Sequence, residues 1–316
     1  MTEDKNKYIL SINGMSKSFG RNKVLKHISM NVKPGTIMGL MGENGAGKST
    51  MMKCLFGTYQ KDEGTIVLDG KEVNFSGPKD ALENGVAMVH QELNQCLERS
   101  VVDNMFLGRY PKNSVGVIDE GRMKKETSDL FRKLGITVDL TQPMKKMSVS
   151  QRQMCEIAKA ISHKAEVIIF DEPSAALTEK EIADLFVIIR DLREKNLGIV
   201  YISHRMDEIK VITDRVTVMR DGGYVGTLIT KDSTKEDIIN MMVGRVIYED
   251  PKEHSMVAPD APVVLKVEHL NAGKMVQDVS FELRKGEILG FSGLMGAGRT
   301  ETARALFGAD PKQSGK

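Results

Sequence analysis

Tryptophan is absent from this 316-residue chain, and aromatic residues of all kinds make up only 5% of it. Methionine occurs 20 times, which favours an adaptable aliphatic core over an aromatic cofactor-binding box. The only cysteines are Cys54, Cys96 and Cys155. Their scattered spacing excludes a cysteine-based metal site and indicates reduced thiols.

Long apolar runs and an excess of charge of one sign are also missing. No stretch of about 18 apolar residues occurs, so the sequence predicts no membrane-spanning helix. Residues 1–5 are polar and do not resemble a secretory signal. With 45 basic and 43 acidic side chains the formal net charge is +2, which argues against a general polyanion binder. We therefore expect no nucleic-acid partner.

The chain does contain a glycine-rich loop with the phosphate-binding pattern. Glycines let backbone N–H groups point at one spot, and the N-terminus of a following helix favours a polyanion. We expect Lys48 to reach the β- and γ-phosphates of a nucleotide and Ser49 to ligate Mg²⁺. The apolar segment 36–41 predicts a buried strand before the loop, and 51–56 a helix after it. The loop residues are Gly42, Glu43, Asn44, Gly45, Ala46, Gly47, Lys48, Ser49 and Thr50.

Two carboxylates follow a second apolar segment. Residues 167–170 are all apolar and predict a buried strand, directly after which come Asp171 and Glu172. In an open α/β sheet this strand end is where ligands bind. We expect Asp171 to hold Mg²⁺ through water and Glu172 to orient and deprotonate the attacking water. The open alternative is a pair of acids that caps a surface helix.

Polar residues after two further apolar segments are weaker signals. Gln91 follows residues 86–89, and its amide could ligate Mg²⁺. His204 follows residues 198–202, and its imidazole could contact the γ-phosphate or position the water. A structural histidine is the alternative at this position.

One helix start could also serve a phosphate. Ser148 is a good N-cap for a helix that continues through Ile161. Its free N–H groups are useful only if a phosphate arrives, and from the residues alone an ordinary capped helix is the favoured interpretation.

The sequence contains an internal repeat. Residues 24–29 and 35–42 match residues 275–280 and 286–293 at a constant offset of 251. We therefore expect a complete nucleotide-binding domain at 1–247, a proline-containing linker at 248–262 and the truncated N-terminal part of a second copy at 263–316. The alternation of short apolar segments with helical patterns predicts an α/β fold with a mostly parallel core sheet, antiparallel strands beside it and a mostly helical lobe at about 93–163.

Together, and in this order, these motifs resemble those of the ATP-binding-cassette (ABC) family, whose nucleotide-binding domains are P-loop NTPases. The resemblance covers residues 8–245 and resumes at 263–316. The corresponding positions are Phe19 (the aromatic residue that stacks on adenine), 42–50 (Walker A), Gln91 (Q-loop), 147–151 (signature), 170–172 (Walker B and catalytic glutamate), 174–177 (D-loop) and His204 (switch histidine).

The resemblance implies an ATP hydrolase with ATP and Mg²⁺ as cofactors. The catalytic residues would be Lys48, Glu172 and His204, and the metal ligands Ser49, Gln91 and Asp171. The signature residues Ser148, Val149, Ser150 and Gln151 would face the nucleotide of a second ABC domain. Two departures are evident: Val149 and Ser150 stand where the family has glycines, and Arg299 stands where the second copy should repeat Lys48. We therefore expect the second site to be weak or altered.

Within the family, residues 88–94, 105–109, 153–160 and 201–206 resemble the duplicated ATPases of bacterial monosaccharide importers. Residues 53–62 are most similar to the galactose/methyl galactoside type, with the ribose type as a close alternative. This resemblance implies a peripheral subunit at the cytoplasmic face of the membrane. Its partners would be membrane permease subunits and, indirectly, an extracytoplasmic sugar-binding protein. A soluble ABC ATPase that acts on ribosomes or DNA is the less favoured alternative.

Overall fold

The computed structural model describes residues 8–244, 257–258, 260–293 and 296–316. The chain divides into two compact units, residues 1–247 and 248–316. Most of the predicted linker, 248–262, lies outside the described residues, so its bounds stay a prediction. Among the described residues, no helix is long and apolar enough to cross a membrane.

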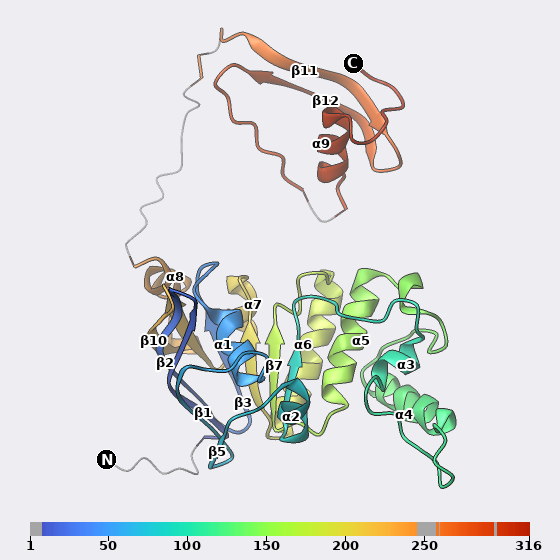
Figure 1. Cartoon of the computed structure of the whole chain (residues 1–316). Coiled ribbons are helices and arrows are strands. Elements are labelled where there is room, and N and C mark those ends of the chain that lie inside the picture. The colour runs from blue at the N-terminus through green and yellow to red at the C-terminus, as the bar shows by residue number, and fades with distance from the viewer. Residues whose placement is uncertain (1–7, 245–256, 259, 294–295) are drawn as a thin grey trace. The chain divides into compact units, whose positions relative to one another are not determined.

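The first unit is built on one ten-stranded mixed sheet (Figure 1). The strand order is β5-β4-β1-β2-β10-β9-β3-β8-β7-β6. The strands are β1 (Leu10–Phe19), β2 (Asn22–Val32), β3 (Thr36–Met41), β4 (Glu63–Leu68), β5 (Lys71–Val73), β6 (Val86–Val89), β7 (Val167–Asp171), β8 (Gly198–Ile202), β9 (Arg215–Arg220) and β10 (Gly223–Ile229).

The central strands β9, β3, β8, β7 and β6 are parallel to one another. Strands β3, β8, β7 and β6 are almost wholly apolar, as expected of strands whose two faces are both covered. Alternate side chains of these strands enter two different cores. One core contains helices α1 (Lys48–Leu55) and α2 (Pro78–Glu83) and the antiparallel strands. The other contains α5 (Val149–Ile161), α6 (Glu179–Glu194), α7 (Met206–Ile212) and α8 (Lys235–Val243).

The antiparallel strands are continuous with the core sheet. Strand β1 pairs antiparallel with β2 on one side and with β4 on the other, and β4 pairs antiparallel with β5. They join the parallel part through β10, by a single pairing of Gly223 with Lys26. The predicted antiparallel strands beside a parallel core are therefore confirmed.

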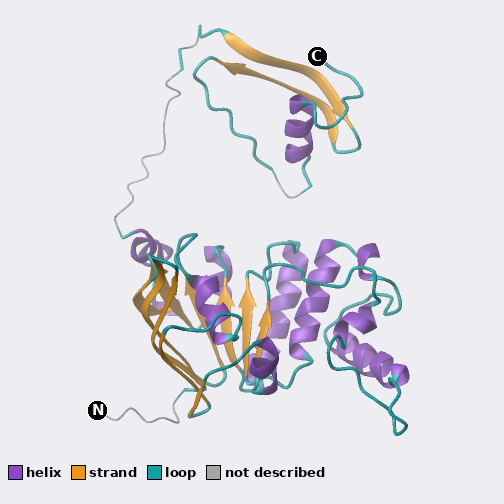
Figure 2. Cartoon of the chain, viewed as in Figure 1, coloured by secondary structure: helices purple, strands orange, loops and turns teal. Residues whose placement is uncertain are grey.

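A separate lobe contains α3 (Val101–Met105), α4 (Glu120–Lys133) and α5. Figure 1 shows it at the far end of the first unit from β1 and β2. It has its own small core, centred on Phe131, Met144 and Cys155. The helices of this lobe all lie within the predicted range 93–163. Long loops join its helices (Figure 2), and apart from the 3-10 turn Met144–Lys146, segments 93–100 and 134–148 contain no helix.

The second unit contains an antiparallel pair, β11 (Val263–Ala272) and β12 (Val276–Arg284), and one helix, α9 (Arg299–Phe307). Residues 287–292, the repeat of β3, form no strand. In the first unit β3 is held by β8 and β9, which come later in the chain. The described residues of the second unit include no such neighbours, and Ile288 is 94% exposed whereas its counterpart Ile37 is fully buried.

Candidate functional site

The glycine-rich loop joins the end of β3 to the start of α1, as its pattern predicts. Gly45 and Gly47 have φ values of 85° and 97°, which L side chains rarely adopt. A Cβ at Gly42 would lie 2.4 Å from the carbonyl oxygen of Met219, and one at Gly47 would lie 2.8 Å from Leu25. Both close approaches require glycine, so these positions fix the curl of the loop.

A cavity of about 390 Å³ opens over this loop. It brings together residues from three separate parts of the sheet edge, because the parallel strands end side by side there. Its lining residues are Val24, Asn44, Gly45, Gly47, Lys48, Ser49, Thr50, Gln91 and Glu172. Val24, on β2, is the one lining residue that the sequence analysis did not single out. No pattern in the sequence indicates it, since it is an ordinary strand valine.

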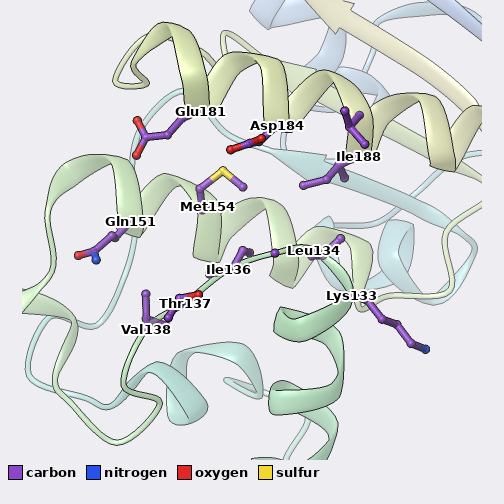
Figure 3. Close-up of a pocket in the computed structure, with 12 residues that line it drawn as sticks. Lys133, Leu134, Ile136, Thr137, Val138, Gln151, Met154, Glu181, Asp184 and Ile188 are labelled. Carbon is purple, nitrogen blue, oxygen red and sulfur yellow. The ribbon is translucent and has the colours of Figure 1, made fainter.

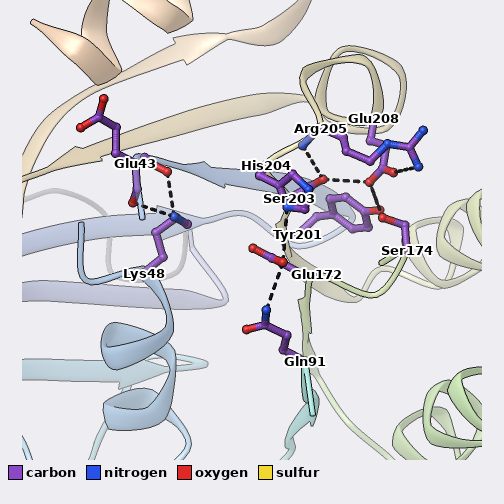
Figure 4. A network of polar contacts seen from close by, with 11 residues as sticks. Glu43, Lys48, Gln91, Glu172, Ser174, Tyr201, Ser203, His204, Arg205 and Glu208 are labelled. Atoms are coloured by element: carbon purple, nitrogen blue, oxygen red, sulfur yellow. Dashed lines mark hydrogen bonds and ion pairs between the residues drawn. The ribbon is translucent and has the colours of Figure 1, made fainter. Parts of the chain in front are cut away.

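Lys48 is buried and held by the loop itself. Its Nζ atom donates to the carbonyl oxygens of Gly42 at 2.7 Å and Glu43 at 3.1 Å (Figure 4). Burial lowers the pKa of this ammonium, whereas the nearby carboxylates of Glu172 and Asp171 act to raise it. Both hydrogen-bond partners are neutral, so the positive charge is oriented without being cancelled by a contact ion pair.

Asp171 ends β7 and is only 3% exposed. Burial raises the pKa of its carboxyl group, and a hydrogen bond from Ser49 opposes that rise. Its Oδ1 atom is buried and has no hydrogen-bond partner among the described residues. A buried carboxylate oxygen left free beside a hydroxyl group suits a divalent cation, whose preferred ligands are oxygens.

Glu172 lies at the centre of a small polar group (Figure 4). Its Oε2 atom accepts a hydrogen bond from Gln91 Nε2 at 3.2 Å and lies 3.3 Å from Nδ1 of His204. Its side chain is mostly shielded, at 17% exposed, whereas that of His204 is 61% exposed. The three polar residues that follow β6, β7 and β8 therefore converge on one point beside the loop cavity.

Other predicted residues lie apart from this cavity. Phe19 is 44% exposed, packs edge-on against Tyr59 at 5.1 Å between ring centroids, and does not line the cavity. Ser148 caps α5 in a capping box with Gln151. Val149 is 54% exposed, and none of residues 148–151 lines the loop cavity.

A second, larger cavity of about 500 Å³ adjoins the start of α5 (Figure 3). It lies between α5, α6 and the segment that follows α4. Gln151, Met154 and Ile136 face it, as do the carboxylates Glu181 and Asp184 on α6. Gln151 is the only predicted site residue in its lining.

The sequence analysis also missed a buried carboxylate behind the polar group. Glu208, on α7, is 4% exposed and accepts hydrogen bonds from Ser174, two residues after Glu172, and from Ser203, directly before His204. Its sole signal in the sequence is its place four residues after His204, in the first turn of α7, which is a weak one because acidic residues are common in first turns.

Comparison with known proteins relates this site to a family. A family model described as ABC transporter matches residues 25–175. The galactose/methyl galactoside import ATP-binding protein MglA of Fusobacterium nucleatum subsp. nucleatum is 50% identical over 313 residues, covering 98% of this chain and 62% of the relative. The proteins of the same name from Treponema denticola and Escherichia coli K12 are 51% and 49% identical, with 97% and 99% of this chain covered. The chain thus spans 62% of the length of these curated relatives.

Solved structures agree on the fold of the first unit. A nucleotide-free ATP-binding cassette from an ABC transporter matches with a TM-score of 0.65 at 22% identity, over 75% of this chain and 96% of that one. An ATP-binding cassette in its ADP conformation matches with a TM-score of 0.64 at 23% identity, over 75% and 95%. These likenesses show the fold, a P-loop NTPase of the ABC type, as the motifs predict. With its loop and its convergent strand ends, the first unit has the fold of an ABC-type ATP-binding cassette, and the chain is similar to the ATP-binding proteins of ABC transporters.

Proposed function

We propose that this chain is part of the ATP-binding and ATP-hydrolysing subunit of a monosaccharide importer. The observation that carries the proposal is the single cavity that Lys48 and Ser49 share with Gln91 and Glu172. A loop of N–H groups with a lysine is suited to a triphosphate, and a carboxylate at the opposite wall is suited to activate water. The names of the close relatives support the transport role.

The loop would bind the nucleotide. Backbone N–H groups of residues 42–50 would cradle the phosphates, with Lys48 held toward them by its two carbonyl contacts. Phe19 would stack on the adenine, although it lies outside the cavity lining. Its 44% exposure leaves ring surface free for a base.

Ser49, Gln91 and Asp171 would hold a Mg²⁺ ion with the phosphate oxygens. The described residues contain no cluster of three or more histidine, cysteine or acidic side chains that could bind a metal by itself. The donor set of a hydroxyl, an amide and one carboxylate therefore fits a cation that arrives with its nucleotide. When bound, the ion would neutralise charge on the β- and γ-phosphates.

Glu172 would act as general base and His204 would position the attacking water or contact the γ-phosphate. The shielding of Glu172 and its contact with Gln91 hold its carboxylate in one place. General-base assistance of this kind contributes roughly 10²–10⁴-fold to a rate.

Hydrolysis would need two ABC domains arranged head to tail. Residues Ser148, Val149, Ser150 and Gln151 would then contact the nucleotide of the opposite domain. Their place at the capped, exposed start of α5, away from their own loop cavity, supports this role.

The partners follow from the same proposal. Membrane permease subunits would dock on the lobe near residues 91–108, an extracytoplasmic sugar-binding protein would deliver the sugar, and the chain would lie at the cytoplasmic face of the membrane. Galactose or methyl galactoside is the favoured cargo on the strength of the relatives' names, with ribose as the alternative. An ABC ATPase acting on ribosomes or DNA is less favoured, since the net charge is only +2.

One experiment tests the proposal at two levels. Phosphate release by this chain should rise more steeply than in proportion to protein concentration, because two copies must meet to complete one site. Co-purification with a sugar permease should be detected, whereas retention on RNA or DNA should not. Strong activity that is independent of concentration would contradict the paired-domain mechanism, and salt-sensitive retention on nucleic acid would favour the alternative.

A further inference from the structure

A buried carboxylate behind the candidate site has no role in the mechanism above. Glu208 lies on α7, is 4% exposed, and is therefore costly to keep charged unless it is well bonded. Its Oε2 atom accepts hydrogen bonds from three hydroxyl groups, those of Ser174 at 2.8 Å, Tyr201 at 2.8 Å and Ser203 at 2.9 Å (Figure 4).

The other oxygen of Glu208 faces a guanidinium group. Arg205 Nη1 lies 2.9 Å from Oε1 and forms an ion pair with it. Oε1 accepts no hydrogen bond from the described residues. The second nitrogen of the same guanidinium donates to Glu179, on α6, at 3.1 Å. Every group around Glu208 is a donor, as an ionised acceptor requires. Burial and the neighbouring Glu208 raise the pKa of the Tyr201 phenol, which keeps that donor protonated.

The partners of Glu208 belong to the two segments that carry the catalytic candidates. Ser174 follows Glu172 by two residues, and Ser203 and Arg205 flank His204. These segments leave neighbouring parallel strands, since Asp171 of β7 pairs with Ile202 of β8. One buried carboxylate thus connects the chain on both sides of the Glu172–His204 contact.

Such a connection is needed because Glu172 has an unfavourable backbone conformation. Its φ of 49° is in the left-handed region, which costs a residue other than glycine on the order of 1–3 kcal/mol. Its N–H group donates to the carbonyl oxygen of Ile202 at 3.0 Å. Without a further restraint on residue 174, this segment could relax and carry the Glu172 side chain away from His204.

We propose that Glu208 is a positioning residue for hydrolysis, which fixes the spacing of segments 172–174 and 203–205 so that Glu172 and His204 face the same point. The inference rests on the proposed function of that site. Glu208 itself does not line the loop cavity. A displacement of about 1 Å at a catalytic group can cost about 100-fold in rate.

The test is Glu208→Gln in the 316-residue chain, with three measurements at a temperature where all variants are folded. The amide is neutral and so removes the ion pair with Arg205 while it keeps the side-chain volume. We expect an unchanged Kd for MgATP, a turnover lowered by about 10- to 100-fold, and an altered NMR signal of the His204 ring, assigned with His204→Ala.

The matched control is Asp214→Asn. This carboxylate also pairs with an arginine, Arg193, at 2.8 Å and accepts from the backbone of Ile37, but it lies outside the polar group. We expect it to lower the melting temperature without changing turnover or the His204 signal. If Glu208→Gln fails to fold, Ser203→Ala removes one hydroxyl donor from the same oxygen and should shift the His204 signal in the same direction.

The results distinguish the positioning role of Glu208 from the proposed ATPase function. Wild-type turnover and an unchanged His204 signal in Glu208→Gln would overturn the positioning role, even if ATP hydrolysis is established. Failure of the unmodified chain to bind MgATP would overturn the proposed function instead, while the His204 signal would still report whether Glu208 sets that contact.

Discussion

His204 and Glu172 meet across the ends of two adjacent parallel strands, with Nδ1 of the histidine 3.3 Å from Oε2 of the glutamate. They are far apart in the sequence: Glu172 is the first residue after β7, and His204 is the second residue after β8. Because β7 and β8 pair in register up to Asp171 and Ile202, the next residues of both strands emerge at the same height. The contact is therefore a consequence of strand pairing.

Lys48→Ala should weaken MgATP binding by about 10- to 100-fold, because a charged hydrogen bond contributes about 1.5–3 kcal/mol. The measurement is the Kd for a fluorescent ATP analogue. Lys180→Ala, an exposed lysine on α6, is the matched control and should leave the Kd unchanged. Equal affinity of Lys48→Ala and the unmodified chain would show that the loop lysine is not at the phosphates.

Glu172→Gln should bind MgATP with unchanged affinity but release phosphate at least about 100-fold more slowly, since the amide cannot accept a proton from water. Binding and phosphate release are measured on the same preparation. Glu194→Gln, at the exposed end of α6, controls for loss of a glutamate charge and should be fully active. Wild-type turnover in Glu172→Gln would exclude a general-base role.

Asp171→Asn should raise the free energy of unfolding at neutral pH by about 1–3 kcal/mol, because the buried carboxylate has an unpartnered oxygen. Burial raises the folded-state pKa of Asp171 above its ordinary value of 3.8. The folded state therefore prefers the protonated acid, and the ionised carboxylate lowers the free energy of unfolding. This destabilisation is fully present above the raised pKa, shrinks as the pH falls below it, and vanishes below 3.8.

Urea unfolding at several pH values measures this difference. The advantage of Asp171→Asn should be constant near neutral pH and decline in acid, while Mg²⁺-dependent nucleotide binding is lost. A variant that is less stable than the unmodified chain at neutral pH would contradict the electrostatic account.

A chain that ends at residue 244 should bind MgATP as tightly as the 316-residue chain, because the first unit contains every residue that lines the loop cavity. It should also bind less of a hydrophobic dye. Phe307 is 90% exposed in the second unit, whereas its counterpart Phe56 is 4% exposed in the first. Affinity measurements and dye fluorescence test both statements, and loss of nucleotide binding in the shorter chain would mean that the second unit supports the site.

The sequence by itself determined the local chemistry of the site. The glycine loop, the strand before it and the two acids after residue 170 are where the pattern predicts them, because each depends on residues close in the chain. The apolar segments of β3, β6, β7 and β8 also identified the buried parallel strands, since strands covered on both faces have little choice of side chain.

The tertiary structure decided which of these local elements meet. Strand order cannot be worked out from the segments one at a time, yet it is what brings Gln91, Glu172 and His204 together and places residues 148–151 elsewhere. Residues 287–292 repeat β3 closely in sequence yet form no strand. The role of Glu208 could not be read from the sequence for the same reason: its partners come from two separate stretches of the chain, and only folding makes one carboxylate their common acceptor.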